Sequence, residues 1–145
     1  MKDLIDSILL DTHGIVVPYS SNMQDAICLL SDVPSASISK YKLSVDSELF
    51  NTGTMFRVIF SFSPDIMENI SIVPLQSRES PQKLYRKVQQ KLSSILGPVT
   101  NVPEAALNFL NADFKNNIWS FSNIKVYHML WEHFGLHGKI SIDIY

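Results

Sequence analysis

The sequence predicts an α+β fold in which an antiparallel β-sheet packs against helices, as a two-layer single domain over residues 1–145. Three observations support this class. Residues 55–62 and 139–145 alternate between apolar and other side chains with the period of two that is typical of strands. Residues 80–97 combine an apolar stripe at helical spacing with start and stop signals for a helix. The length of 145 residues is close to the usual size of one domain.

The first 39 residues are predicted to form a short amphipathic helix, a short strand, a second helix and a loop, over residues 3–10, 14–19, 22–30 and 32–39. In the first of these segments the apolar residues recur at helical spacing. Pro18 restricts the strand to a sheet edge or a strand end, because proline cannot donate a ladder hydrogen bond. Asn22 is a favourable N-cap, so the second helix is expected to begin there.

The middle of the chain is predicted to form three strands and two helices: strands over 44–50, 55–62 and 69–75, a helix over 81–96, and a shorter helix that begins at Pro103. The second and third strands are expected to pair as an antiparallel hairpin. Ser80 is a favourable N-cap for the longer helix, and Pro81 fits its first position, where the missing N–H costs nothing. Gly97 then ends that helix.

The last block, Trp119 to Tyr145, is aromatic and rich in strand signals. Strands are predicted over 118–121, 124–131 and 139–145, with turns at 122–123 and 134–138. Alternation places His128 on the same face of its strand as Val126 and Leu130. In the final strand it separates three isoleucines from the polar residues, and one apolar face is enough to pack on a second layer.

Charge is distributed unevenly along a chain whose net charge is −2. Residues 1–76 carry nine acids against four bases, and residues 77–145 carry eight bases against five acids. An acidic half suits a basic partner, because complementary potentials speed association and penalise wrong partners. The alternative is that the charges are scattered by chance.

The cysteine content and the apolar runs of the sequence bear on where in the cell the protein is expected to work. Cys28 is the single cysteine, so no internal disulfide can form and a reducing environment is the simpler assumption. We expect no signal peptide at residues 1–10, because Asp3 and Asp6 interrupt the apolar run. No run of 18 apolar residues occurs, so we expect no membrane partner and a cytoplasmic location.

The last block contains three histidines that could form a catalytic or metal site, His128, His133 and His137, near Glu132 in the sequence. A zinc protease needs two histidines four residues apart on a helix, and here the spacing is wrong and the segment is predicted to be a strand. We therefore interpret these histidines as structural or surface residues, with an enzyme built on them as the alternative. Cys28 lacks a base fixed by spacing, and the sequence lacks nucleotide-binding glycine motifs. The expectation is a protein that is not an enzyme and holds neither a cofactor nor a metal.

The predicted long helix has a basic outer face, formed by Lys83, Arg86, Lys87 and Lys91. Such a face can meet phosphates, so a nucleic-acid binder is a further alternative. The chain as a whole is acidic, however, whereas binders of this kind usually have a basic charge. A solvated helix face is the preferred interpretation, and we expect no nucleic-acid partner. The aromatic rings of the last block are expected to be mostly core, with one or two exposed as a binding patch.

The order of segments carries a resemblance over about residues 55–145. An aromatic hairpin over 56–75 leads into a helix that ends in Leu-Gly-Pro, and a tryptophan-led strand then runs into IKVYHMLWEHFG. This resembles small bacterial immunity proteins that protect a cell from polymorphic toxins, including those of contact-dependent growth inhibition. The positions that match the family pattern are Trp119, His128, Glu132, His133, Phe134 and Gly135. His133 stands where the pattern would have arginine.

The resemblance implies a cytoplasmic protein that binds its cognate toxin stoichiometrically and blocks its active site or substrate entry. Such toxins are often basic nucleases, so an acidic surface on this chain would mimic nucleic acid and speed association. By charge and expected exposure, we predict that the partner-binding residues are Asp46, Glu48, Asp65 and Glu68. A monomer is the expected state. The alternative function is a secretion chaperone for an effector protein, which would usually be a dimer.

Overall fold

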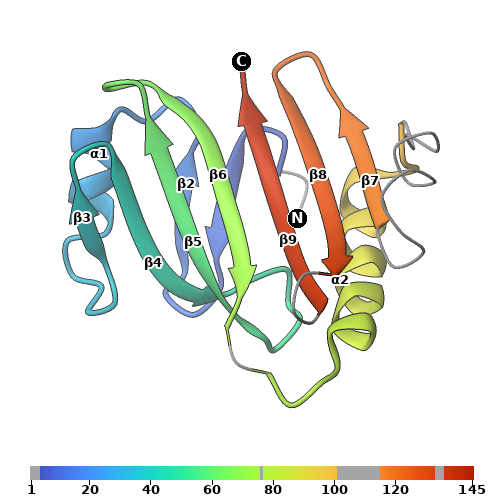
Figure 1. Ribbon diagram of the computed structural model, residues 1–145. Helices are drawn as coiled ribbons and strands as arrows, with labels where there is room; N and C mark the ends of the chain where they lie inside the picture. The colour runs from blue at the N-terminus through green and yellow to red at the C-terminus, as the bar shows by residue number, and fades with distance from the viewer. Residues whose placement is uncertain (1–3, 76, 101–114, 133–135) are drawn as a thin grey trace.

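The structure, a computed structural model, describes residues 4–75, 77–100, 115–132 and 136–145 and is rich in β-strands (Figure 1). Strands make up 47% of the described residues and helices 19%. The elements are β1 (Ser7–Leu10), β2 (Ile15–Pro18), α1 (Met23–Leu29), β3 (Ser37–Ser39), β4 (Lys42–Glu48), β5 (Met55–Phe62), β6 (Met67–Pro74), α2 (Pro81–Leu96), β7 (Lys115–Ser120), β8 (Ile124–Glu132) and β9 (Leu136–Ile144). The predicted α+β two-layer class is therefore wrong, because strands dominate and the described residues contain only two helices.

Seven strands form one antiparallel sheet in the order β3-β4-β5-β6-β9-β8-β7, and β1 pairs with β2 in a separate hairpin. The strand β9 lies in the interior of the large sheet, between β6 and β8. It therefore joins two sets of neighbouring strands, β3 to β6 on one side and β7 and β8 on the other (Figure 1). The two sets are separated along the chain by α2.

One face of the large sheet carries apolar side chains in register across its strands. A single row of cross-strand partners runs through Leu43, Phe60, Ile70, Ile142, Val126 and Trp119. Each member of this row is at most 1% exposed. Cross-strand neighbours on one face pack directly against each other, so this row ties six strands into one core.

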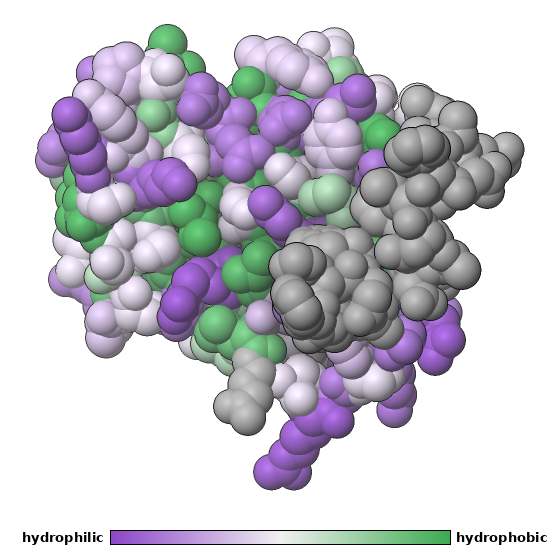
Figure 2. Space-filling model, in the orientation of Figure 1, coloured by the Kyte–Doolittle hydropathy of each residue, from purple (hydrophilic) through white to green (hydrophobic). Residues whose placement is uncertain are grey.

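The buried face is covered by α2, α1 and the β1–β2 hairpin, which lie behind the sheet in Figure 1. The helix α2 contributes a stripe of buried residues, Leu84, Tyr85, Val88, Leu92 and Leu96. The opposite face is mixed, and Figure 2 shows hydrophilic and apolar residues interspersed on it. A polar row of partners crosses it, formed by Lys42, Ser61, Asn69, Asp143, Lys125 and Ser120. In the described parts of the chain, no helix is long and apolar enough to cross a membrane.

Local signals located both helices correctly. The Ser80 side chain accepts a hydrogen bond from the Lys83 amide (3.2 Å), Pro81 is the first residue of α2, and Gly97 caps its end with φ +84°. The Asn22 side chain likewise accepts from the Asp25 amide (2.8 Å) at the start of α1. The predicted helices over 81–96 and from Asn22 are confirmed.

Two predictions in the first third are wrong. The segment predicted as a helix over 3–10 contains β1, in which Ile8 and Leu10 are buried and Leu10 pairs with Ile15. Its apolar spacing fits a helix, but pairing with β2 decides the structure of so short a segment. The segment predicted as a loop over 32–39 contains β3. The helix predicted from Pro103 and the residues His133, Phe134 and Gly135 lie outside the described residues.

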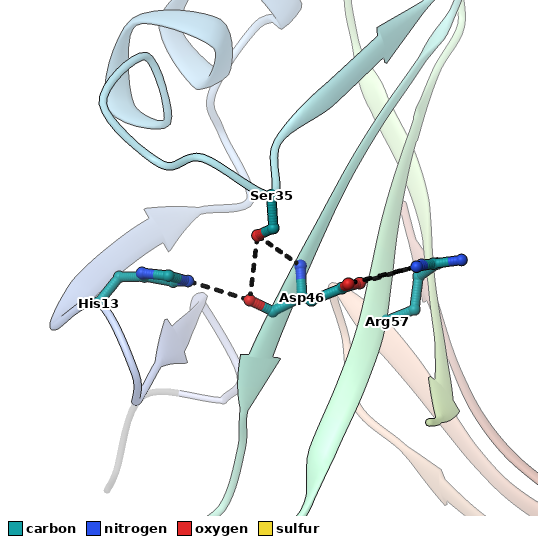
Figure 3. Close-up of polar contacts among 4 residues, drawn as sticks. All are labelled: His13, Ser35, Asp46 and Arg57. Atoms are coloured by element: carbon teal, nitrogen blue, oxygen red, sulfur yellow. Dashed lines mark hydrogen bonds and ion pairs between the residues drawn. The ribbon is translucent and has the colours of Figure 1, made fainter. Parts of the chain in front are cut away.

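The edge of the sheet beyond β3 is closed by hydrogen bonds from loops (Figure 3). The Ser35 hydroxyl accepts from the Asp46 amide (3.2 Å), and His13 Nε2 lies 3.0 Å from the Asp46 carbonyl oxygen. The Glu48 amide donates to Thr12 Oγ1 (2.8 Å). These bonds use main-chain groups that an edge strand would otherwise offer to another chain.

The opposite edge is closed in a similar way. The Thr100 amide donates to the Ile118 carbonyl oxygen (2.8 Å), and the Ser120 amide donates to Thr100 Oγ1 (3.1 Å). Strand addition beside β7, or beside β4 past the end of β3, would have to displace these bonds.

The buried apolar face predicts unequal costs for two identical substitutions. Val58→Ala removes methyl groups from a fully buried side chain of β5 and should lower the free energy of unfolding by about 2 kcal/mol. Val16→Ala in β2 is the matched control, because its side chain is 49% exposed, and it should change stability by less than about 0.5 kcal/mol. Urea denaturation of both variants measures the difference, and equal costs would contradict the assignment of the buried face.

Candidate functional site

The four acids predicted to bind a partner lie in different parts of the sheet. Asp46 and Glu48 belong to β4, Asp65 lies in the turn between β5 and β6, and Glu68 belongs to β6. Glu48 pairs with Met55 at the start of β5, whereas Asp65 follows the end of that strand. The eight residues of β5 span about 23 Å, so Glu48 and Asp65 lie at opposite ends of the sheet.

Asp46 already has a partner within the chain. Its carboxylate receives hydrogen bonds from Arg57 Nε (3.0 Å) and a second guanidinium nitrogen (3.2 Å), in the two-point geometry that suits this pair (Figure 3). The hydrogen bond and the negative charge of Asp46 raise the pKa of Arg57. The main chain of Asp46 also holds Ser35 and His13. We therefore assign Asp46 a structural role, because it joins β4 to β5 through Arg57 and to the two loops that contain Ser35 and His13.

Asp65 and Glu68 lie instead at an end of the sheet where three connections meet, at the upper left of Figure 1. The Phe62 amide donates to the Tyr41 carbonyl oxygen (2.8 Å), which joins the β5–β6 turn to the β3–β4 turn. The Met23 amide donates to the Asp65 carbonyl oxygen (3.2 Å), which joins the same turn to the start of α1. Three separate segments of the chain are thus held together at this end.

Large apolar side chains remain exposed at this end. Ile66 is 73% exposed, Ile38 is 59% exposed and Tyr41 is 46% exposed. We call Ile38, Tyr41, Asp65, Ile66 and Glu68 the turn-end surface. Tyr41 and Ile66 lie on the two joined turns, and Ile38 lies in β3 beside the first of them. Single exposed apolar residues are common on proteins, whereas a group of them can mark an interaction site.

The charge of the turn-end surface is also available for a partner. Asp65 and Glu68 are exposed, and neither takes part in an ion pair among the residues that the structure describes. A base is present too, since Lys40 Nζ lies 5.2 Å from the centroid of the Tyr41 ring. The surface therefore combines apolar contact area with unpaired acids and an aromatic ring flanked by a cation.

The histidines do not form a cluster in the described structure. His128 is 3% exposed and faces the core with Val126 and Leu130, as predicted. Its ring stacks on Tyr85 with centroids 3.9 Å apart, and its Nδ1 lies 2.6 Å from Gln89 Oε1. His137 is exposed. Within the described ranges, no three metal-ligating side chains come together.

Burial fixes the protonation states around His128. Desolvation lowers the pKa of His128 to about 3, so the imidazole is neutral at neutral pH. Burial raises the pKa of Tyr85 to about 12, opposed by a hydrogen bond that its hydroxyl accepts from Asn117 (2.6 Å). The contacts described for this neutral ring, its stacking on Tyr85 and its bond to Gln89, are those of a packing group.

Comparison of the chain with protein-family models, with curated proteins and with solved structures gives no match in any of the three.

The sequence offered one signal for the turn-end surface that charge alone did not use. Ile66 is an apolar residue in the connection between the two strands of the predicted hairpin, where polar residues and glycine are usual. The exposure of Tyr41 and Ile38 had no comparable signal, because it depends on β3 being a short strand at the edge of the sheet.

His128 predicts a specific loss of stability in mild acid. The unfolded state binds a proton near pH 6.5 and the folded state only near pH 3, so this contribution is full above pH 6.5 and is lost as the pH falls. Between pH 7 and pH 5 the wild-type protein should lose about 2 kcal/mol that a His128→Gln variant does not lose. Urea denaturation at each pH measures the two slopes. Val16→Ala, which changes no titrating group, is the control and should keep the wild-type slope; parallel curves for wild type and His128→Gln would refute the burial of the neutral ring.

Proposed function

We propose that this chain works by binding another protein through the turn-end surface, as an immunity protein that neutralises a cognate toxin. The observation that carries the proposal is the grouping of three exposed apolar side chains with two unpaired acids on β3, the start of β6 and the turns beside them, which hydrogen bonds join to one another. Aromatic and large apolar residues dominate the energy of protein interfaces, and charged residues around them set the rate of association and the choice of partner.

The physical form of the surface suits recognition by side chains. Loop hydrogen bonds occupy main-chain groups of β7 and of β4 past the end of β3, so main-chain pairing is the less favourable mode of contact at these positions. The turn-end surface is held by main-chain hydrogen bonds at 2.8–3.2 Å, which reduces the conformational entropy that a partner would have to remove. A rigid patch of this kind favours tight, stoichiometric binding.

The toxin class that fits this surface is a basic one, and a nuclease is the leading candidate. Asp65 and Glu68 would face cationic groups that otherwise hold nucleic-acid phosphates. Inhibition would follow from steric and electrostatic occupation of the toxin's substrate site. This mode needs no chemistry from the bound chain, so the proposed role is that of a binding protein and not an enzyme.

The direct test is co-expression with the product of the adjacent upstream gene. That product alone should arrest growth, and the present chain should restore growth and co-purify with it as a one-to-one complex. An upstream product that is harmless, or an arrest that this chain does not relieve, would reject the immunity role. A complex with a harmless secreted effector, formed by a dimer of this chain, would identify the alternative chaperone role.

Asp65 and Glu68 should differ from Glu48 in a binding assay. The double variant Asp65→Asn/Glu68→Gln removes both charges of the turn-end surface and should weaken toxin binding at least tenfold, mainly through slower association. Ile66→Ala should weaken it through faster dissociation. The matched control is Glu48→Gln at the opposite end of the sheet, which should bind as wild type does. Surface plasmon resonance gives both rates, and an effect confined to Glu48→Gln would move the site away from the turns.

A further inference from the structure

The sheet contains a fork between its central strands. β6 and β9 pair from Asn69↔Asp143 to Ile72↔Ile140, and the ladder stops there. β6 nevertheless continues to Pro74, and β9 begins at Leu136 (Figure 1). Proline cannot donate to a ladder, which disfavours further pairing at this end of β6. The two strands diverge below the last pair in Figure 1.

A cavity of about 480 Å³ lies at this fork and extends under α2. Residues 72–74 of β6 and 137–140 of β9 line it from the two arms of the fork. The deeper wall is mainly apolar and includes Phe56, Ile72, Leu84, Val88 and Ile140. His128 and Tyr85 line it as well, both as neutral rings. This volume and largely apolar lining are typical of small-molecule sites.

One lysine and one glutamate line the cavity. Lys139 lines it and has no ion pair among the described residues. Glu79 lines it too, but its Oε1 receives a hydrogen bond from Lys87 Nζ (3.0 Å). Arg78 and Lys83 are exposed on either side of Glu79 in the chain. The N-terminus of the 16-residue helix α2 adds a partial positive charge at the same place.

One observation favours a cationic ligand instead. The second oxygen of Glu79, Oε2, is buried and has no hydrogen-bond partner in the described structure. It is closed off from the cavity in this conformation, since almost none of its surface is accessible. Lys87 is bonded to Glu79, and Lys139 has no ion pair among the described residues. The cavity should therefore prefer a ligand with a negative charge.

We propose that the fork cavity binds a small apolar carboxylate, with its tail among Phe56, Leu84 and Val88 and its head near Lys139. The site lies at the end of the sheet away from the turn-end surface, where β5 begins and β6 ends. Binding there and binding of a protein partner at the turns are separate properties, and either can fail without the other.

Two probes that share an alkyl tail and differ in the charge of the head group test which ligand charge the cavity prefers. Octanoate and octylamine share the same chain length and carry opposite charges at neutral pH. Titration of the full chain with octanoate, followed by ¹H–¹⁵N correlation spectra, should shift the amides of Gly138, Lys139 and Val88 and leave those of the turn-end surface in place. Octylamine should bind at least tenfold more weakly. Equal binding of the two probes, preference for the amine, or no shift at the fork would overturn the proposal.

Octanoate binding to two variants, Lys139→Met and Gly138→Val, locates the ligand. Lys139→Met keeps the length of the side chain, removes its charge, and should weaken octanoate binding about tenfold, whereas Lys42→Met on β4 should have no effect. Gly138→Val should weaken octanoate binding by narrowing the cavity where β9 lines it. A Cβ at Gly138 would meet only the Met129 carbonyl oxygen, at 3.8 Å, and Gly138 pairs with the buried Leu130.

The valine variant also separates loss of the site from loss of the fold. Valine suits a strand better than glycine and would fill apolar space, so the melting temperature of Gly138→Val should equal or exceed that of the wild type. A folded Gly138→Val protein that still binds octanoate with wild-type affinity would place the ligand elsewhere and refute the proposal. Lys139→Met should also retain full growth rescue, because the protein-binding surface is intact.

Discussion

The pairing of β9 with both β6 and β8 is the constraint on which the rest of the structure depends. This strand lies near the end of the sequence and yet occupies the interior of the sheet, so the strands before α2 and those after it share one apolar row. The row gives the sheet a single buried face, which α2, α1 and the β1–β2 hairpin cover (Figure 1). The early end of the β6–β9 ladder leaves the fork and its cavity.

The main-chain groups at the edges of a sheet need hydrogen-bond partners. The turns between its strands are available for binding. Loops close the β4 and β7 edges with hydrogen bonds from His13, Ser35, Thr12 and Thr100. Asp46 takes part in this closure through its main chain and bonds to Arg57 through its carboxylate, although its charge made it a candidate for binding. Exposed apolar groups and unpaired acids occur together where the β3–β4 and β5–β6 turns adjoin α1. Loops on a rigid scaffold are where proteins usually place their binding residues.

The sequence predicted the parts of the fold that depend on neighbouring residues. The ends of α2 follow from Ser80, Pro81 and Gly97, and the face of His128 follows from simple alternation. The predicted class was wrong because strands dominate the described residues. One contribution is the segment over 3–10, predicted as a helix, which contains β1; its apolar spacing could not predict the pairing of β1 with β2. Two of the four candidate acids, Asp65 and Glu68, lie together at the turns. The bond of Asp46 to Arg57 and the fork depend on register between strands, which no local pattern contains.

Amide hydrogen exchange of the chain bound to its proposed protein partner, compared with the free chain, tests the central claim most directly. Binding at the turn-end surface should slow exchange at residues 38–41 and 63–68 and at the start of α1. Exchange along β7, β8 and the fork should be unchanged. Protection confined to the fork, to the basic face of α2 or to the polar face of the sheet would contradict the account.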